Sequence, residues 1–212
     1  MPVIFRKLLP DEFGGYQDHL VRLSGRDRVS RFHAGTADES IERHCQRLRW
    51  PETRLIGCFI DGVLRGAVEL QSFQRPGAAI GAELAVSVED AYQGHGIGTE
   101  LVRRALLVAR NRWIRGVGML SLANNFRMRE IGRRYGGRSN LDDGSIETVY
   151  RLSRPDARSF AEEMADDGVA LVFLGLNRWQ RSIRTPRHDM PAFAAMRPAT
   201  AMAGTGVAAF GA

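Results

Sequence analysis

The spacing of hydrophobic positions along the chain predicts a mixed α/β domain. Apolar residues that alternate with polar ones, or form short runs between turn residues, predict strands; these are residues 3–8, 55–60, 63–70, 79–88, 118–123, 138–141 and 146–152. Apolar positions three and four residues apart predict helices; these are residues 10–23, 38–48, 99–113 and 125–135. The apolar face of the third ends at Trp113, which is expected to pack in the core. Residues 24–36 are polar and are predicted to form a loop.

The pattern divides the chain into three parts. Residues 1–154 carry the strands and helices of one α/β domain. Residues 155–186 are predicted to form a helical extension with two helices, the second of which spans residues 170–184. Residues 187–212 are rich in Ala, Gly, Pro and Met without periodicity, and we expect this tail to be disordered.

Composition narrows the class of protein. No apolar run reaches the roughly 18 residues that a membrane span needs, and the N-terminus is too charged for a signal peptide, so we expect a cytoplasmic protein without membrane contact. The net charge is +6, and all but one of the basic residues are arginines, the exception being Lys7. The arginines are scattered and not interleaved with aromatic residues, which does not favour nucleic-acid binding. Cys45 and Cys58 are expected to be buried thiols, and no cluster has metal-ligand spacing.

A glycine-rich stretch, Gln93-Gly-His-Gly-Ile-Gly98, lies between a predicted strand and a predicted helix. Backbone amides freed by glycine, together with the positive end of a helix, form a binding site for an anion. A dinucleotide-binding motif would need glycine where Thr99 stands and an acid about 20 residues later, and neither is present. A nucleotide-triphosphate loop would need a lysine here. The remaining alternatives are a pyrophosphate site and a simple connecting turn.

The stretch resembles the acyl-CoA pyrophosphate loop, Q/R-x-x-G-x-G/A, of the GNAT acetyltransferase superfamily. Upstream, the strand Ala-Glu-Leu-Ala-Val-Ser-Val at residues 82–88 is similar to the family's fourth strand, and downstream Asn125-Phe-Arg-Met128 is similar to its N-x-x-M/A element. Together with residues 23–32, these motifs resemble the bacterial protein-lysine acetyltransferase branch. The resemblance covers residues 3–152. It implies a GNAT fold: a mixed, mostly antiparallel sheet with a splayed central strand pair and flanking helices, here followed by the helical extension.

The resemblance also implies a cofactor and a catalytic base. Glu83 matches the family's catalytic glutamate; its apolar sequence neighbours lead us to expect a water-poor site, in which desolvation would raise the pKa of the carboxyl group. The alternative is an exposed glutamate on an edge strand. The Val86 amide is the expected oxyanion donor. The residues expected to bind acetyl-CoA are Val86 and Val88 for the pantetheine arm, Gln93, Gly94, His95, Gly96, Ile97, Gly98 and Thr99 for the pyrophosphate, and Asn125 for the pantetheine side. No metal is expected.

Some residues depart from the family pattern or allow a second interpretation. Asn125 could equally be a helix N-cap. Gly132 stands where many members have a tyrosine that protonates the leaving thiolate, and Tyr135 is expected to belong to the core. Gly137 replaces a common phenylalanine, which predicts a loosened connection to the last hairpin. His95 titrates near neutrality but lies inside the loop, so we do not assign it as the base.

The acceptor is the least constrained part of the reaction. The expected partner is an amine, and the branch resemblance favours a protein lysine; a homodimer is compatible with the sequence. Acidic residues could line an acceptor site or occupy solvated turns; these are Glu89, Asp90, Asp142, Asp143 and Glu147. Two alternatives stay open: acetylation of a small-molecule amine, and a catalytically weak acyl-CoA-binding module whose C-terminal helices contact a partner.

Overall fold

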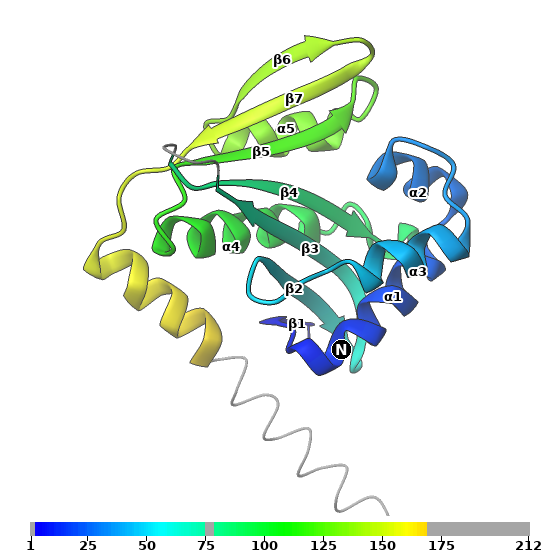
Figure 1. The fold of residues 1–212 in the computed structure, drawn as a ribbon, viewed down its shortest axis with the longest axis horizontal. Helices are drawn as coiled ribbons and strands as arrows, with labels where there is room; N and C mark the ends of the chain where they lie inside the picture. The colour runs from blue at the N-terminus through cyan, green and yellow to red at the C-terminus, as the bar shows by residue number, and fades with distance from the viewer. Residues whose placement is uncertain (1–2, 75–78, 169–212) are drawn as a thin grey trace, which may run out of the picture.

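The computed structural model describes residues 3–74 and 79–168 as an α/β structure with one sheet (Figure 1). The strands are β1 Val3–Lys7, β2 Thr53–Ile60, β3 Val63–Phe73, β4 Gly81–Val88, β5 Gly116–Leu122, β6 Arg138–Asp142 and β7 Ser145–Arg151. The helices are the 3-10 turns η1 Pro10–Glu12 and η2 Asp90–Tyr92, and α1 Phe13–Arg22, α2 Gly25–Phe32, α3 Asp38–Gln46, α4 Ile97–Asn111 and α5 Phe126–Arg134. Residues 157–168 form a further helix.

The seven strands lie in the order β1-β2-β3-β4-β5-β7-β6, and only β4 and β5 are parallel. Side chains alternate between the two faces of the sheet, as strand geometry requires. Ile56 and Cys58 point to the larger core, which lies against α4 and α5, whereas Leu55, directly before Ile56, points to a second cluster against α1 and α3. The α/β class and the mostly antiparallel sheet predicted from the sequence are confirmed.

The parallel pair separates along its length. Register pairs join β4 to β5 only over Gly81–Glu83, opposite Gly116–Gly118, although β4 continues to Val88 and β5 to Leu122. β4 stays paired with β3 over its whole length, so it is β5 that diverges from it (Figure 1). The expected splayed central pair is therefore present.

Two sequence-based predictions are wrong. Residues 24–36 are not all loop, because α2 occupies most of them; its N-cap Ser24 accepts a hydrogen bond from the Asp27 amide at 3.2 Å. Polar contacts hold this helix, such as the Arg28 hydrogen bond to the Val21 carbonyl at 2.5 Å, so apolar periodicity does not reveal it. Trp113, expected to pack in the core, is exposed because the chain turns through a positive φ of 61° at this residue.

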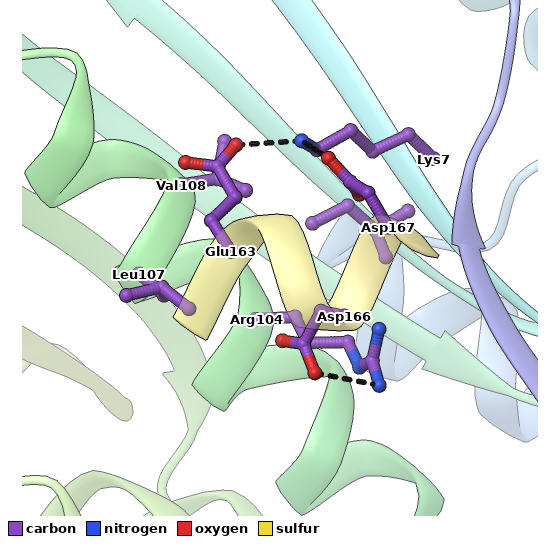
Figure 2. Close-up of a pocket in the computed structure, with 8 residues that line it drawn as sticks. Lys7, Arg104, Leu107, Val108, Glu163, Asp166 and Asp167 are labelled. Carbon is purple, nitrogen blue, oxygen red and sulfur yellow. Dashed lines mark hydrogen bonds and ion pairs between the residues drawn. The ribbon is translucent and has the colours of Figure 1, made fainter. Parts of the chain in front are cut away.

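The helix at residues 157–168 packs on α4 and β1 through ionic contacts. Lys7 Nζ lies 2.6 Å from a carboxylate oxygen of Glu163 and 2.6 Å from one of Asp167, and Arg104 pairs with Asp166 (Figure 2). The gap between these side chains has a volume of about 10 Å³, room for a single water molecule at most. The first expected helix of the extension is thus present, whereas residues 170–184 and the tail from 187 lie outside the described residues. No helix in the described ranges has the length and apolarity to cross a membrane.

Candidate active site

The glycine loop connects η2 to α4 and exposes its backbone. Gly94 and Gly96 adopt left-handed conformations, with φ of +81° and +80°, and a Cβ atom at either position would meet nothing within 4 Å. Glycine is therefore favoured here by backbone conformation and leaves the outer side of the loop open. The first intrahelical bond of α4 runs from Glu100 N to Gly96 O at 3.0 Å. The amides of residues 97–99 precede it and have no acceptor within the helix.

Other residues of the loop surround these amides. Ile97 is buried in the main core, and Gly98 and Thr99 are half-buried in the first turn of α4. His95 is exposed at the tip of the loop, between the two left-handed glycines. An open row of N–H groups at a helix N-terminus is an arrangement that binds phosphate oxygens.

Gln93 makes contacts within the protein that the sequence did not predict. Its own amide donates to Asp90 O at 3.1 Å within the preceding turn, so this N–H is engaged by the protein. The side chain instead joins three elements: Nε2 donates to Val88 O at 2.9 Å and to Asp27 Oδ1 at 3.0 Å, and Oε1 accepts from Arg127 at 2.5 Å. Gln93 therefore ties β4, α2 and α5 together beside the loop.

Glu83 lies in the last register pair before β4 and β5 separate. Its neighbours across the sheet are Gln71 on β3 and Gly118 on β5. The expectation of a water-poor setting is wrong, because the Glu83 side chain is exposed. The apolar residues next to it in sequence, Ala82 and Leu84, point to the opposite face, and Gly118 provides no side chain to shield it.

Val86 and Val88 lie in the part of β4 that has left β5. Both side chains are half-buried against the main core, and the two residues pair with Val68 and Gly66 of β3. Beyond Glu83 no register pair occupies the β5 side of the strand within the described chain. Peptide groups there need partners from outside the sheet.

A buried polar network anchors the end of β4. His19 on α1 contacts Ser87 Oγ at 2.9 Å through Nε2 and Glu89 Oε1 at 3.2 Å through Nδ1. Glu89 also accepts from Arg22 at 2.9 Å and Arg65 at 2.8 Å. Burial raises the pKa of Glu89, but the hydrogen bonds from His19, Arg65 and Arg22 outweigh it and lower the pKa to about 2. The sequence allowed two interpretations of Glu89, a solvated turn residue and an acceptor-site residue. Both are wrong, because its carboxylate is buried and engaged in this network.

A second buried network joins α1, α2 and α3 to β3. Glu69 accepts hydrogen bonds from Tyr16 at 2.9 Å and Arg31 at 2.7 Å, and His44 Nε2 lies 2.8 Å away. Burial raises the pKa of Glu69, but His44, Arg31 and Tyr16 together hold it below its usual value. Neither network was predicted from the sequence. The one indication was His19, a titratable residue between apolar positions of a predicted helix, which belongs to the Glu89 network.

Asn125 begins α5 as an N-cap. Its Oδ1 accepts a hydrogen bond from Met128 N at 3.2 Å, so the capping interpretation is confirmed. Tyr135, near the other end of α5, packs against the main core and donates its hydroxyl to Thr99 O at 3.1 Å. Burial raises the pKa of Tyr135.

Gly137 does not loosen the connection to the last hairpin. A Cβ atom at this position would overlap Cγ2 of Thr148 and lie 2.9 Å from both the Gly132 carbonyl and the Tyr150 ring. The prediction of a loosened connection is therefore wrong, because Tyr150 and Thr148 already fill the space that a larger side chain would use.

The remaining acidic residues lie at the surface. Asp90, Asp142, Asp143 and Glu147 are exposed, and Asp143 lies in the hairpin turn with a φ of 41°. Glu147 pairs with Leu120, two residues beyond Gly118 on β5, so it shares the sheet face of Glu83. Within residues 3–74 and 79–168, no cluster of three metal-ligating side chains is present. Cys45 and Cys58 are free thiols whose pKa values burial raises to about 11 and about 12.

Comparison with known proteins places this site in a family. Residues 18–136, more than half of the chain, match the acetyltransferase (GNAT) family. The GNAT domain of S. lividans PAT aligns at 22% identity with a TM-score of 0.59, covering 70% of this chain and 89% of that one. A GNAT-family acetyltransferase from Streptococcus pneumoniae aligns at 14% identity with a TM-score of 0.57, covering 71% and 100%. Salmonella typhimurium yncA, determined with its cofactor acetyl-CoA, aligns at 13% and 0.54, covering 74% and 99%. This chain belongs to the GNAT acetyltransferase family.

Proposed function

We propose that this protein is an acetyl-CoA-dependent N-acetyltransferase that acts on a protein lysine, with Glu83 as the general base. The observation that carries the proposal is the position of Glu83: an exposed carboxylate in the last pair before β4 and β5 separate. The glycine loop lies at the far end of the same strand. One strand therefore connects a phosphate-binding loop to a candidate base.

The described residues fit the coenzyme. The outer side of Gly94 and Gly96 is open, as close approach of a pyrophosphate to the loop amides requires. The unpaired side of β4 near Val86 offers peptide groups to the pantetheine amides, whereas the Val88 carbonyl already accepts from Gln93 Nε2 at 2.9 Å. When bound there, acetyl-CoA supplies the acetyl thioester.

The protein then has two chemical tasks: to remove a proton from the amine and to stabilise the charge that develops on the thioester oxygen. A lysine amine is protonated at neutral pH and must lose a proton before its lone pair attacks the thioester carbonyl. Glu83 accepts that proton, directly or through a water molecule that its exposure admits. The Val86 amide donates to the carbonyl oxygen as negative charge develops on it. Collapse of the tetrahedral intermediate breaks the carbon–sulfur bond. The nitrogen releases its second proton to solvent to give the neutral amide, and the thiolate takes a proton from solvent, since Gly132 provides no hydroxyl.

The surface beside Glu83 supports lysine as the acceptor. Gly116 and Gly118 leave the β5 backbone uncovered on this face, and Leu120 is exposed further along the strand. Glu147 lies opposite Leu120. An aliphatic stem that ends in an ammonium group matches an apolar strip flanked by two carboxylates. The motifs shared with the protein-lysine acetyltransferase branch support the same acceptor.

The test combines binding and turnover. Acetyl-CoA at about 1 mM raises the melting temperature by roughly 5 °C if its dissociation constant is near 10 μM. Glu83→Gln is expected to retain this shift and to lower kcat at least ~100-fold on a lysine peptide, the usual contribution of a general base. Glu147→Gln is the comparison: an exposed carboxylate on the same face, whose loss is expected to raise the KM for the lysine peptide and to leave most of kcat in place.

Each alternative predicts a distinct result. Turnover with a small diamine but not with lysine peptides would identify a small-molecule acetyltransferase. A melting shift without turnover on any amine would identify an acyl-CoA-binding module. Absence of a shift would reject the coenzyme assignment.

A further inference from the structure

The side-chain amide of Gln93 has a fixed orientation. Asp27 Oδ1 and Val88 O are both acceptors, so the group that faces them at 3.0 and 2.9 Å is the NH₂ of Gln93. The carbonyl oxygen Oε1 is thereby directed to the guanidinium of Arg127, which donates to it at 2.5 Å. Two contacts therefore orient the Gln93 amide, and a third holds Arg127 next to this first residue of the glycine loop.

Arg127 differs from the other cations near the loop. Arg103 and Arg104 both pair with Glu100 in the first turns of α4. Arg65 pairs with Glu89. Among the described residues, no carboxylate lies within 4.0 Å of the Arg127 guanidinium, whose recorded partner is the neutral amide of Gln93. Its positive charge is therefore held beside the loop without an acidic partner.

The glycine loop itself carries little charge. Residues 93–99 contain no lysine, arginine, aspartate or glutamate, so the loop offers amide dipoles alone. The nucleotide part of coenzyme A carries a pyrophosphate and a 3′-phosphate. A guanidinium matches phosphate oxygens with two parallel donors, which makes an arginine at the rim of such a loop the expected complement.

We propose that Arg127 binds a phosphate group of the coenzyme and that Gln93 positions it for this contact. The inference rests on the proposed function and adds a residue to it. Gln93 also donates a hydrogen bond to Asp27 of α2. This bond links the coenzyme loop to α2, the helix that contacts β4. Gln93 is a positioning residue, and Arg127 is the residue that touches the ligand.

Arg129 is the matched control. It lies on the same helix and is likewise exposed, but its guanidinium stacks on the Phe126 ring at 4.6 Å and has no contact with Gln93. Affinity for acetyl-CoA is measured by titration calorimetry on the full chain. Arg127→Ala is expected to weaken binding about 10-fold, within the range of one charge-assisted contact, and Arg129→Ala less than 2-fold.

Acetyl-CoA and two truncated forms of it identify the phosphate that Arg127 contacts. If Arg127 binds the 3′-phosphate, Arg127→Ala changes the affinity for acetyl-CoA but not for acetyl-dephospho-CoA. If it binds the pyrophosphate, both affinities fall by the same factor. S-acetyl-phosphopantetheine lacks the adenosine part and keeps only the phosphate next to the pantetheine. If Arg127→Ala also weakens its binding, Arg127 contacts that phosphate; if it does not, Arg127 contacts the phosphate next to the adenosine. The effect is expected to shrink as salt is raised, because the contact is at the surface.

A second variant tests the positioning role. Gln93→Ala removes the amide that orients Arg127 and adds no charge beside the loop. Affinity for acetyl-CoA is expected to fall by no more than in Arg127→Ala, and the double variant is expected to match Arg127→Ala, because the two residues act through one contact. Far-UV circular dichroism checks that each variant is folded.

The outcomes separate this inference from the proposed function. Equal affinities for wild type, Arg127→Ala and Arg129→Ala would overturn the role of Arg127 and leave acetyl-CoA binding established. A wild-type chain that binds neither acetyl-CoA nor its dephospho form would overturn the coenzyme assignment and, with it, the role of Arg127.

Discussion

His19 on α1 and Glu89 at the end of β4 are joined by a contact of 3.2 Å between Nδ1 and Oε1, beneath the point where β4 has left β5. Ser87, on the other side of the imidazole, completes a buried chain of polar groups. These contacts hold the end of β4 against α1 and β3. They fix the end of β4 on its α1 side, while β5 diverges from its other edge.

The first prediction concerns acid stability. Glu89 has a pKa lowered to about 2 from 4.5 by His19, Arg65 and Arg22, so its contribution to stability is present above pH 4.5 and is lost as the pH falls toward 2. Glu89→Gln is expected to lower the free energy of unfolding by about 2 kcal/mol at pH 7, since it leaves buried donors without their charged acceptor. Urea unfolding at pH 7 and pH 3 measures both values. The difference between wild type and variant should be smaller at pH 3.

The neighbouring Asp90→Asn is the control for that experiment. Asp90 is exposed and follows Glu89 directly, and its replacement is expected to change stability by less than about 0.5 kcal/mol. If Asp90→Asn and Glu89→Gln behave alike at pH 7, the network does not stabilise the strand.

The second prediction concerns the glycine loop. Gly94→Ala and Gly96→Ala each force an alanine into a left-handed conformation and are expected to cost about 1 kcal/mol in stability. They should also weaken acetyl-CoA binding, because relief of the strain redirects the amides. Gly98→Ala is the comparison, since its Cβ would lie no closer than 3.6 Å to Ile131. Retained affinity in Gly96→Ala would contradict a role for the loop backbone.

The third prediction concerns Gly137. Gly137→Ala introduces a methyl group into space filled by Thr148 and Tyr150 and is expected to lower the free energy of unfolding by about 2 kcal/mol. Gly15→Ala lies within α1, where a Cβ meets nothing within 4 Å, and should raise stability by roughly 0.5 kcal/mol through helix propensity. Thermal unfolding of the two variants gives shifts of opposite sign. An unchanged melting temperature in Gly137→Ala would mean that Thr148 and Tyr150 of the hairpin move to make room for the methyl group.

The fourth prediction concerns the helix at residues 157–168. Glu163 accepts from Lys7 at 2.6 Å and from Arg112 and Asn111 at 2.8 Å, so Glu163→Gln removes the charge that joins two cations. Its cost is expected to be about 2 kcal/mol, and hydrogen exchange of the helix amides should accelerate. Glu162→Gln, which breaks one exposed pair with Arg103, should cost less than about 1 kcal/mol. Equal exchange in the two variants would argue against docking through Glu163.

Local patterns were sufficient for much of the fold. The strands, the helix after the glycine loop and the cap at Asn125 depend on residues that are close in sequence. Glu83 was misjudged because Ala82 and Leu84, its sequence neighbours, point to the opposite face of the sheet. The environment of a strand residue depends on the residues beside it in the sheet, here Gln71 and Gly118. The sequence pattern around Glu83 does not contain that information.

The two buried networks depend on distant residues. His19 and Glu89 are 70 positions apart, and Arg31 and Glu69 are 38 apart. A single sequence gives each residue its type but not its partner, so Glu89 looked like an ordinary acid in a turn. Helix α2 was missed for the same reason: apart from Phe32, which packs against the second cluster, polar side chains hold it to distant residues such as Glu69 and Gln93.

The single lysine of the chain lies at the docked helix. Lys7 is the one ε-amino group in the sequence, and its ammonium nitrogen is held between Glu163 and Asp167. An amine-reactive label therefore has two targets, Lys7 and the α-amino group, which peptide mass spectrometry separates. The rate at which Lys7 is modified reports how often this helix leaves α4, without any engineered probe. Because the chain has one lysine and this lysine is held in ion pairs, little self-acetylation of lysine is expected in an acetylation assay. The acetyl-lysine that such an assay detects would then come from the acceptor protein.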